Sequence, residues 1–288
     1  MERKIKLKAH YWNQVEEEDS NGQKKLFIYI GGLNEEQKTV HVKVHGFTPF
    51  VYLELPRKIS WNKMLCEKLY RYLKDNMRNC CPVSFAPCSK YNLYGKHQLL
   101  TIRFSFESNL GCYYFAKFMS QGRIIPGVGS FSKGDFKVHE HNIDPIIKFT
   151  ALKKIKLAGW IEIKEKILED EKDLDVEERK FTTADVDCHC DWKDVQPIEA
   201  PEGVLIRHKY LFYDIECNSE NHNSKIPDPA LPENCICQIS VTVGRVGTKE
   251  RTRYLLTLGS PLEIKDTTVF TFKKEGQLLL KFSSLVRE

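Results

Sequence analysis

The chain has 288 residues, a length typical of about two domains. It is 41% apolar and 29% charged, a globular composition that excludes bulk disorder, and no uncharged run approaches the ~18–20 apolar residues of a membrane helix. Residues 1–160 carry 26 basic and 14 acidic side chains, and residues 161–288 carry 18 and 25. The basic first half therefore favours either a polyanionic partner such as nucleic acid or a solvated lysine-rich surface.

The N-terminus and the ten cysteines predict an intracellular protein with reduced thiols. The first eight residues lack the apolar segment of a secretory signal, and the cysteines do not have the spacing of a disulfide framework. A zinc site formed by Cys188, Cys190, Cys235 and Cys237 is the weaker alternative, because the usual Cys-x₂₋₄-Cys spacing is absent. Lys153-Lys-Ile-Lys156 is too short for a nuclear localisation signal and is interpreted as surface charge.

Residues 1–165 have the pattern of a mixed α+β domain. Short runs of β-branched and aromatic residues predict strands, and apolar residues three to four positions apart predict helices. Gly31 and Gly32 are interpreted as a turn between the first two strands. In chain order we expect strands over 26–30 and 40–44, a turn and strand over 46–55, a helix from Ser60 to 73, a strand over 99–106 and a helix over 110–118. A strand over 148–158 then leads into a turn at Gly159 and Trp160, and another strand follows the turn.

The composition changes after residue 165. Seven acids and one lysine occupy residues 169–178, and such a run repels itself, so residues 166–202 are predicted to be an acidic linker and connecting segment. Residues 203–288 suit the opening of an α/β or α+β sheet domain. There we expect strands over 204–217, 235–243, 251–258 and 269–272, and a helix over 278–286.

Asp214 and Glu216 are the candidate catalytic and metal-binding residues. They lie two positions apart on a predicted strand, so both side chains point to one face. The surrounding run from Tyr210 to Cys217 is largely apolar and predicted to be buried, and buried carboxylates need metal ions or hydrogen bonds as compensation. Two Mg²⁺ ions about 3.5–4 Å apart can drive phosphodiester cleavage. The alternative is a chance pair on an edge strand.

Three segments of the second half carry a resemblance: Tyr213-Asp-Ile-Glu-Cys217, the loop Pro227-Asp-Pro229 and Ile236-Cys-Gln-Ile-Ser240. In this order they resemble the first exonuclease motif of family B DNA polymerases, of the delta-like and large-DNA-virus type. Further segments that are similar to the family are the tail 269–282, which corresponds to the helix before the second exonuclease motif, and the first-half segments 46–52 and 138–161.

The resemblance implies a mixed N-terminal domain over 1–165 and an incomplete ribonuclease-H-like exonuclease domain over 203–288. It also implies two Mg²⁺ ions, with Asp214 bridging both and Glu216 binding one of them and positioning the attacking water. In the complete enzyme the expected function is DNA replication on template and primer strands from dNTPs, with removal of mispaired 3′ nucleotides. The expected location is the nucleus or a viral replication site in the cytoplasm.

The chain departs from the family pattern towards its C-terminal end. The second and third exonuclease motifs and the polymerase palm, fingers and thumb have no match before Glu288. We therefore expect a fragment or one subunit of a split polymerase, with the missing part supplied in cis or in trans, and little or no activity from these 288 residues alone. The alternatives are a non-catalytic DNA-binding or assembly module and a free-standing metal-dependent nuclease.

Overall fold

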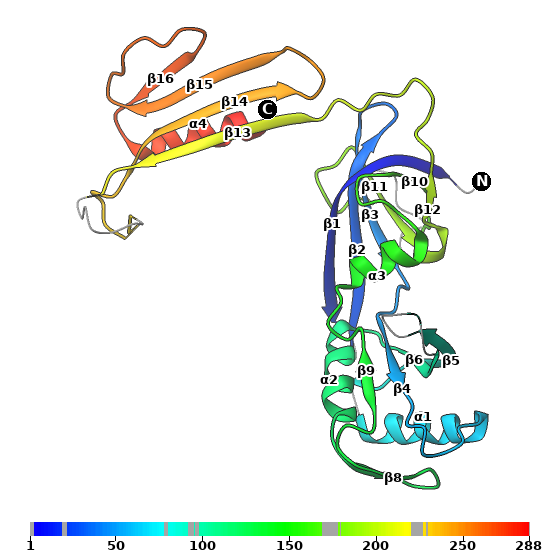
Figure 1. The fold of residues 1–288 in the computed structure, drawn as a ribbon. Coiled ribbons are helices and arrows are strands. Elements are labelled where there is room, and N and C mark those ends of the chain that lie inside the picture. Colours follow the sequence, from blue (N-terminus) through cyan, green and yellow to red (C-terminus); the bar gives the residue numbers. More distant parts are fainter. Residues whose placement is uncertain are drawn as a thin grey trace. The chain divides into compact units, whose positions relative to one another are not determined.

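A computed structural model describes residues 3–18, 22–77, 80–91, 95, 98–168, 178, 180–219, 227–228 and 230–287. The chain divides into two compact units, Met1–Val204 (unit one) and Leu205–Glu288 (unit two), and each is described by itself (Figure 1). Within the described ranges, no helix has both the length and the apolar character needed to cross a bilayer.

Unit one contains a six-stranded sheet with the order β11-β3-β2-β1-β10-β12. Neighbouring strands are antiparallel except β11 and β3, which are parallel. The strands span Lys4–Glu18 (β1), Lys24–Asn34 (β2), Thr39–His45 (β3), Trp160–Lys164 (β10), Val186–Asp191 (β11) and Gln196–Ile198 (β12). The predicted strands over 26–30 and 40–44 are therefore confirmed as parts of β2 and β3.

One face of this sheet forms an apolar core. Buried and less buried residues alternate along β3, because successive side chains of a strand point to opposite faces. Leu7, Ile30 and Val42 are fully buried, and they belong to one cluster with Phe149 of the helix α3 (Pro145–Lys153). Burying one large apolar side chain contributes roughly 1.5–3 kcal/mol to stability, so this cluster holds sheet and helix together.

A four-stranded sheet with the order β5-β6-β4-β9 completes unit one. Its region comprises β4 (Phe50–Glu54), α1 (Lys63–Met77), β5 (Ser84–Tyr91), β6 (Gln98–Ser105), α2 (Asn109–Met119), the hairpin of β7 (Arg123–Ile125) and β8 (Gly129–Phe131), and β9 (Lys137–His139). Leu69 of α1 and Phe115 of α2 pack with Phe104 of β6 in a second apolar cluster. The helices expected from Ser60 and over 110–118 are confirmed in type, with shifted ends.

Gly31 and Gly32 lie inside β2, so the prediction of a turn at these residues is wrong. The chain turns after Asn34 instead. A Cβ atom on Gly32 would lie 2.4 Å from the carbonyl oxygen of Lys8 on the neighbouring strand β1. The glycine therefore permits a close approach of two strands rather than a change of direction.

Residues 145–153 form α3, so the predicted strand over 148–158 is wrong. The Asp144 carboxylate caps this helix by accepting a hydrogen bond from the Ile146 amide at 2.7 Å, and Pro145 occupies the first turn. The helix ends at Lys154, which has a left-handed backbone conformation with φ of 55°. These end signals outweigh the strand propensity of the β-branched residues between them.

Part of the range 166–202, predicted as a linker, folds into unit one instead. β11 pairs with β3 in parallel, and β12 pairs with β10 in antiparallel fashion. Cys188, Cys190 and Val195 are buried in the core of the six-stranded sheet, so this part of the segment belongs to the folded unit. Almost all of the acidic run, residues 169–177, lies outside the described residues.

Unit two is a four-stranded sheet, β13-β14-β15-β16, with the helix α4 packed on one face (Figure 1). The elements span Lys209–Cys217 (β13), Ile236–Arg245 (β14), Arg251–Leu258 (β15), Thr268–Phe272 (β16) and Glu275–Arg287 (α4). β16 is parallel to β15, and the other pairs are antiparallel. Ile239, Val241 and Leu256 of the sheet form the core with Leu278 and Leu285 of α4. All five elements predicted after residue 203 are confirmed, apart from their ends.

Candidate functional site

Asp214 and Glu216 lie together on the outer face of β13. The ring of Tyr213 contacts that of Phe282 in α4, with centroids 5.2 Å apart, so the odd-numbered side chains of this strand face the helix. Because side chains alternate along a strand, the two carboxylates point to the opposite face. The strand thus brings both acids to one surface, as their spacing predicts.

Both carboxylates are exposed to solvent, so the prediction that this run is buried is wrong. The reason is the position of β13 at one edge of the sheet, with α4 packed only on the other face. Phe212, the residue before Tyr213, keeps 66% of its surface exposed. Exposed carboxylates remain hydrated, so burial does not by itself require a metal ion here, and the argument for metal depends on the donor atoms.

Cross-strand neighbours add polar groups beside the carboxylates. Asp214 lies opposite Ser240, and Glu216 lies opposite Gln238, in the antiparallel pairing of β13 with β14. Directly opposed residues have Cβ atoms about 4.5–5.5 Å apart, so a hydroxyl and a carboxamide adjoin the acids. These oxygen atoms suit a hard cation such as Mg²⁺. Among the described residues, no three His, Cys, Asp or Glu side chains are grouped to hold a metal ion, so the pair supplies only part of a metal centre.

Sequence reasoning did not identify Ser240 and Gln238 as neighbours of the carboxylates. The register of β13 and β14 shifts between Glu216 and Cys217, which leaves an irregularity at Cys237. There the Cys237 thiol donates a hydrogen bond to the backbone oxygen of Glu216 at 3.3 Å. A shift of one residue exchanges the faces of a strand, and neither strand's sequence alone determines where the shift falls.

The cysteines considered for zinc have two different surroundings. Cys188 and Cys190 lie in the core of unit one, where burial raises the pKa of the Cys190 thiol to about 12 and that of Cys188 well above its usual value. Both thiols lie among apolar side chains of the core, which supply no further zinc ligands. Cys235 and Cys237 belong to unit two, and over the described ranges neither pair joins a third metal-ligating residue.

A family model described as DNA polymerase family B, exonuclease domain, matches residues 136–288 of this chain. The match covers more than half of the chain. It begins inside unit one, near β9, and extends through all of unit two. The strand that carries Asp214 and Glu216 therefore lies within the matched range.

Several viral proteins are similar to the chain over nearly its whole length. DNA polymerase 037L of Invertebrate iridescent virus 6 is 32% identical over 311 residues, which cover 96% of this chain and 24% of the viral protein. The DNA polymerase of Acanthamoeba polyphaga mimivirus is 27% identical, over 96% and 16% of the two chains. DNA polymerase 120R of Invertebrate iridescent virus 3 is 29% identical, over 97% and 25%. The chain thus spans a quarter or less of the length of these relatives.

A solved structure has a similar fold. The family B DNA polymerase from the hyperthermophilic archaeon Pyrobaculum calidifontis superposes with a TM-score of 0.60, over 98% of this chain and 29% of the archaeal chain. The two sequences are 11% identical over this alignment, so the likeness is one of fold. It supports a mixed α/β architecture of several sheets for this chain.

Proposed function

This chain belongs to the exonuclease-domain family of the family B DNA polymerases, and from that premise we propose that it forms the N-terminal and proofreading region of a DNA-directed DNA polymerase. The observation that carries the proposal is the family match over residues 136–288, which contains the carboxylate-bearing strand. We assign unit one, which comprises residues 1–165 together with the strands β11 and β12, to the N-terminal domain and residues 203–288 to the first part of the exonuclease domain. Nucleotidyl transfer on template and primer DNA, with dNTPs as substrates, belongs in this proposal to the whole protein, of which this chain is one part.

Asp214 and Glu216 are proposed to hold the metal ions of the exonuclease site. Two bound Mg²⁺ ions would supply an activated water and charge stabilisation for hydrolysis of a 3′-terminal phosphodiester. Both carboxylates share one solvent-facing surface, where a DNA end has access, and the Ser240 hydroxyl opposite Asp214 offers a further oxygen. Further acidic ligands are expected from polymerase sequence other than these 288 residues, in cis or in trans.

The location follows from the proposed function. A replicative polymerase acts where DNA is copied, either in the nucleus or at a viral replication site in the cytoplasm. The relatives named above are polymerases of viruses, which agrees with the viral alternative.

The test is metal binding by the 288-residue chain together with excision of a mispaired 3′ nucleotide. Mn²⁺, followed by electron paramagnetic resonance as a substitute for Mg²⁺, is expected to bind weakly to the chain, and Asp214→Asn with Glu216→Gln is expected to abolish this binding. Glu250→Gln with Glu263→Gln is the matched control, because these exposed acids also belong to unit two and their replacement changes the charge equally. We expect no excision by the chain alone. Equal Mn²⁺ binding by both double variants contradicts the assignment.

A non-catalytic DNA-binding or assembly module is the second candidate. It is favoured by the incomplete set of metal ligands among the described residues. Salt-sensitive binding of primer–template DNA, with no Mn²⁺ site at Asp214 and Glu216, would support this candidate over the exonuclease assignment.

A further inference from the structure

A groove of about 600 Å³ lies on unit one, between β1, the segment after α3 and the segment that includes β12. Its lining includes Lys8, Lys154 and Lys156, together with Trp160 and Ile198. The volume is within the range of ligand sites, about 300–1,000 Å³. The groove belongs entirely to unit one, and the carboxylate pair described above contributes nothing to it.

The floor of the groove is a row of side chains across three strands. Lys8 pairs with Trp160, and Trp160 pairs with Ile198, in the registers of β1, β10 and β12. Leu7 and Ile161, one position along β1 and β10, are fully buried in the core on the other face. The row therefore lies on the face opposite the core. Trp160 is outside the core cluster yet only 8% exposed, so its indole and Ile198 form an apolar floor.

The three lysines of the groove have no acidic partner. Within the described ranges, none of Lys8, Lys154 and Lys156 forms an ion pair, and Glu199 is the only acidic residue in the lining. Three ammonium groups around one groove repel each other unless an anion lies between them. The arrangement therefore creates a positive site that an anionic ligand would stabilise.

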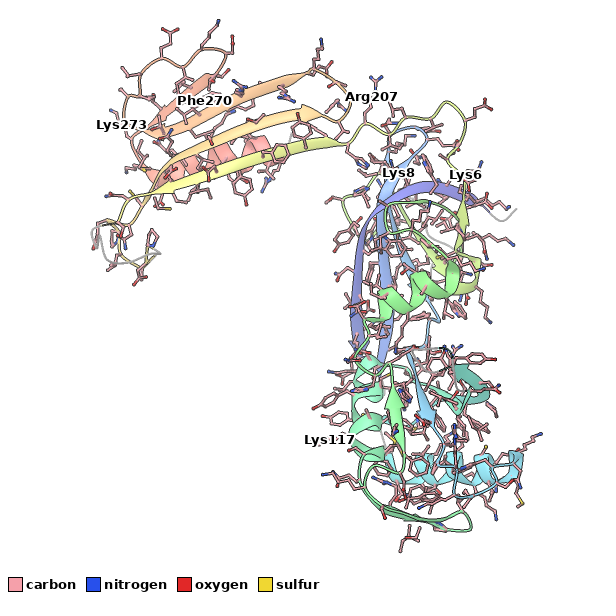
Figure 2. All side chains as sticks on the ribbon, viewed as in Figure 1. Lys6, Lys8, Lys117, Arg207, Phe270 and Lys273 are labelled. Atoms are coloured by element: carbon pink, nitrogen blue, oxygen red, sulfur yellow. The ribbon has the colours of Figure 1, made fainter. Side chains whose placement is uncertain are left out.

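Two other lysines of β1, Lys4 and Lys6, do form ion pairs. Lys4 Nζ lies 2.9 Å from Glu162 Oε1, and Lys6 Nζ lies 3.8 Å from Glu35 Oε1. Lys6 and Lys8 are both seen on β1 in Figure 2. Lys4 and Lys6 are thus neutralised by ion pairs, whereas Lys8 lies in the groove without one, and the lining holds three lysines and a single acid, Glu199.

Lys154 has an unusual backbone conformation for its residue type. Its φ of 55° places it in the left-handed region, at the end of α3, where glycine is the common residue. A lysine is disfavoured there by its Cβ atom. The position nevertheless supplies one of the three cations that line the groove.

We propose that this groove binds single-stranded nucleic acid, with backbone phosphates at Lys8, Lys154 and Lys156 and a base against the apolar floor of Trp160 and Ile198. The inference rests on the proposed polymerase function, and it adds a DNA contact in unit one that is independent of the carboxylates. Single-strand sites combine a positive groove for the backbone with an aromatic or apolar surface for the bases, and both elements are present. A flexible single strand can place phosphates at the lysines and a base on the floor at the same time.

The test is the binding of fluorescent oligo-dT to the 288-residue chain, measured by anisotropy between 50 and 200 mM salt. The variant Lys8→Gln/Lys154→Gln/Lys156→Gln is expected to bind about tenfold or more weakly at low salt. Its salt dependence, as the slope of log K against log salt, is expected to fall by about 2, because each phosphate contact on a single strand contributes about 0.7.

The matched control is Lys4→Gln/Lys6→Gln/Lys38→Gln. It removes the same net charge from unit one, but from lysines that are already ion-paired, including Lys38 with Glu36 at 2.8 Å. The control is expected to bind oligo-dT within about threefold of the unmodified chain. Equal losses in both triple variants, or no loss in the groove variant, would overturn the proposal.

Two further measurements separate the possible causes of failure. In amine acetylation followed by mass spectrometry, oligo-dT should protect the three groove lysines of the unmodified chain and should not protect Lys4. If the groove lysines are not protected, the site is refuted. This result does not depend on whether a variant folds. An acidic peptide that binds the groove while oligo-dT does not would replace nucleic acid with a protein partner and refute the proposal. If oligo-dT binds elsewhere and the Mn²⁺ site is present, the groove proposal fails while the proposed exonuclease region stands.

Discussion

Units one and two both pack a helix on one face of a sheet, and they differ in what the other face carries. In unit one that face bears lysines of β1 and the well-covered Trp160. In unit two it bears Phe212, which is 66% exposed, beside the two carboxylates. Apolar surface that stays in water adds nothing to stability and favours association with other molecules. The two outer faces therefore differ in composition: that of unit one is lysine-rich and leaves its tryptophan covered, whereas that of unit two combines an exposed aromatic ring with two carboxylates.

The largest expected effect separates a buried phenylalanine of unit one from an exposed one of unit two. Phe104→Ala removes a fully buried ring and is expected to lower the free energy of unfolding by about 3–5 kcal/mol. Phe212→Ala removes an exposed ring and is expected to cost less than about 0.5 kcal/mol. Urea unfolding followed by tryptophan fluorescence reports on unit one alone, since Trp12, Trp61, Trp160 and Trp192 all lie there; circular dichroism follows both units. If both variants lost a similar free energy of unfolding, the contrast between the buried ring of unit one and the exposed ring of unit two would be contradicted.

A smaller effect is expected from adding one methyl group to each unit. In Gly32→Ala the new Cβ would meet the Lys8 carbonyl oxygen at 2.4 Å, and because this neighbour is backbone, β1 and β2 must separate. We expect a loss of about 1–3 kcal/mol in the same unfolding measurement. In Gly276→Ala, within α4, nothing lies within 4 Å of the new atom, and the higher helix propensity of alanine should raise stability by up to about 1 kcal/mol. A neutral Gly32→Ala variant would show that the two strands adjust freely.

The smallest effect expected is a pH dependence confined to unit one. His45 Nε2 lies 2.8 Å from His189 Nδ1, and burial, followed by the nearby His189, lowers the pKa of His45 from its usual 6.5 to about 4. Between these values the unfolded chain binds more protons than the folded one, so the free energy of unfolding falls as the pH falls from 6.5 to 4. Because the ring is partly exposed, we expect a loss of about 1–2 kcal/mol rather than the full value of the shift.

The control for this effect is a second histidine of unit one. His45→Gln should remove part of the pH dependence seen by tryptophan fluorescence, since His41, whose pKa burial also lowers, contributes as well; His10→Gln, which replaces an exposed residue, should retain the full dependence. An unchanged dependence in His45→Gln would assign the titration to other groups.

Local patterns predict the elements whose burial depends on near neighbours. In the strands after residue 203, the alternation of apolar residues is visible in the sequence of each strand. The start of α2 is likewise marked locally, because its N-cap Ser108 directly precedes the helix. The strand β11 also alternates apolar and polar residues, but this alternation does not identify its partner: Cys188 and Cys190 are buried through pairing with β3, which lies far away in the sequence. Sequence patterns of a single segment contain no information on that pairing.

The same limit applies to the two sites. The spacing of Asp214 and Glu216 predicts their common face, but their exposure depends on which strand forms the edge of the sheet. The groove was not predicted, because Lys8 and Lys154 come from distant segments and the second of them was interpreted as surface charge. The registers of β1, β10 and β12 bring Lys8 beside Trp160 and Ile198, and the left-handed end of α3 adds Lys154.

The parallel pairing of β11 with β3 sets the order of events during synthesis. The Thr39 amide donates a hydrogen bond to Asp185, 146 positions later, at the start of this pairing. On the ribosome, β3 must therefore wait with one edge unpaired while well over a hundred residues are added, which takes on the order of 10 s at typical elongation rates. Closing so long a loop is also slow by topology. The nascent chain therefore exposes an open strand edge for seconds, and this is the interval in which a chaperone would protect it from aggregation.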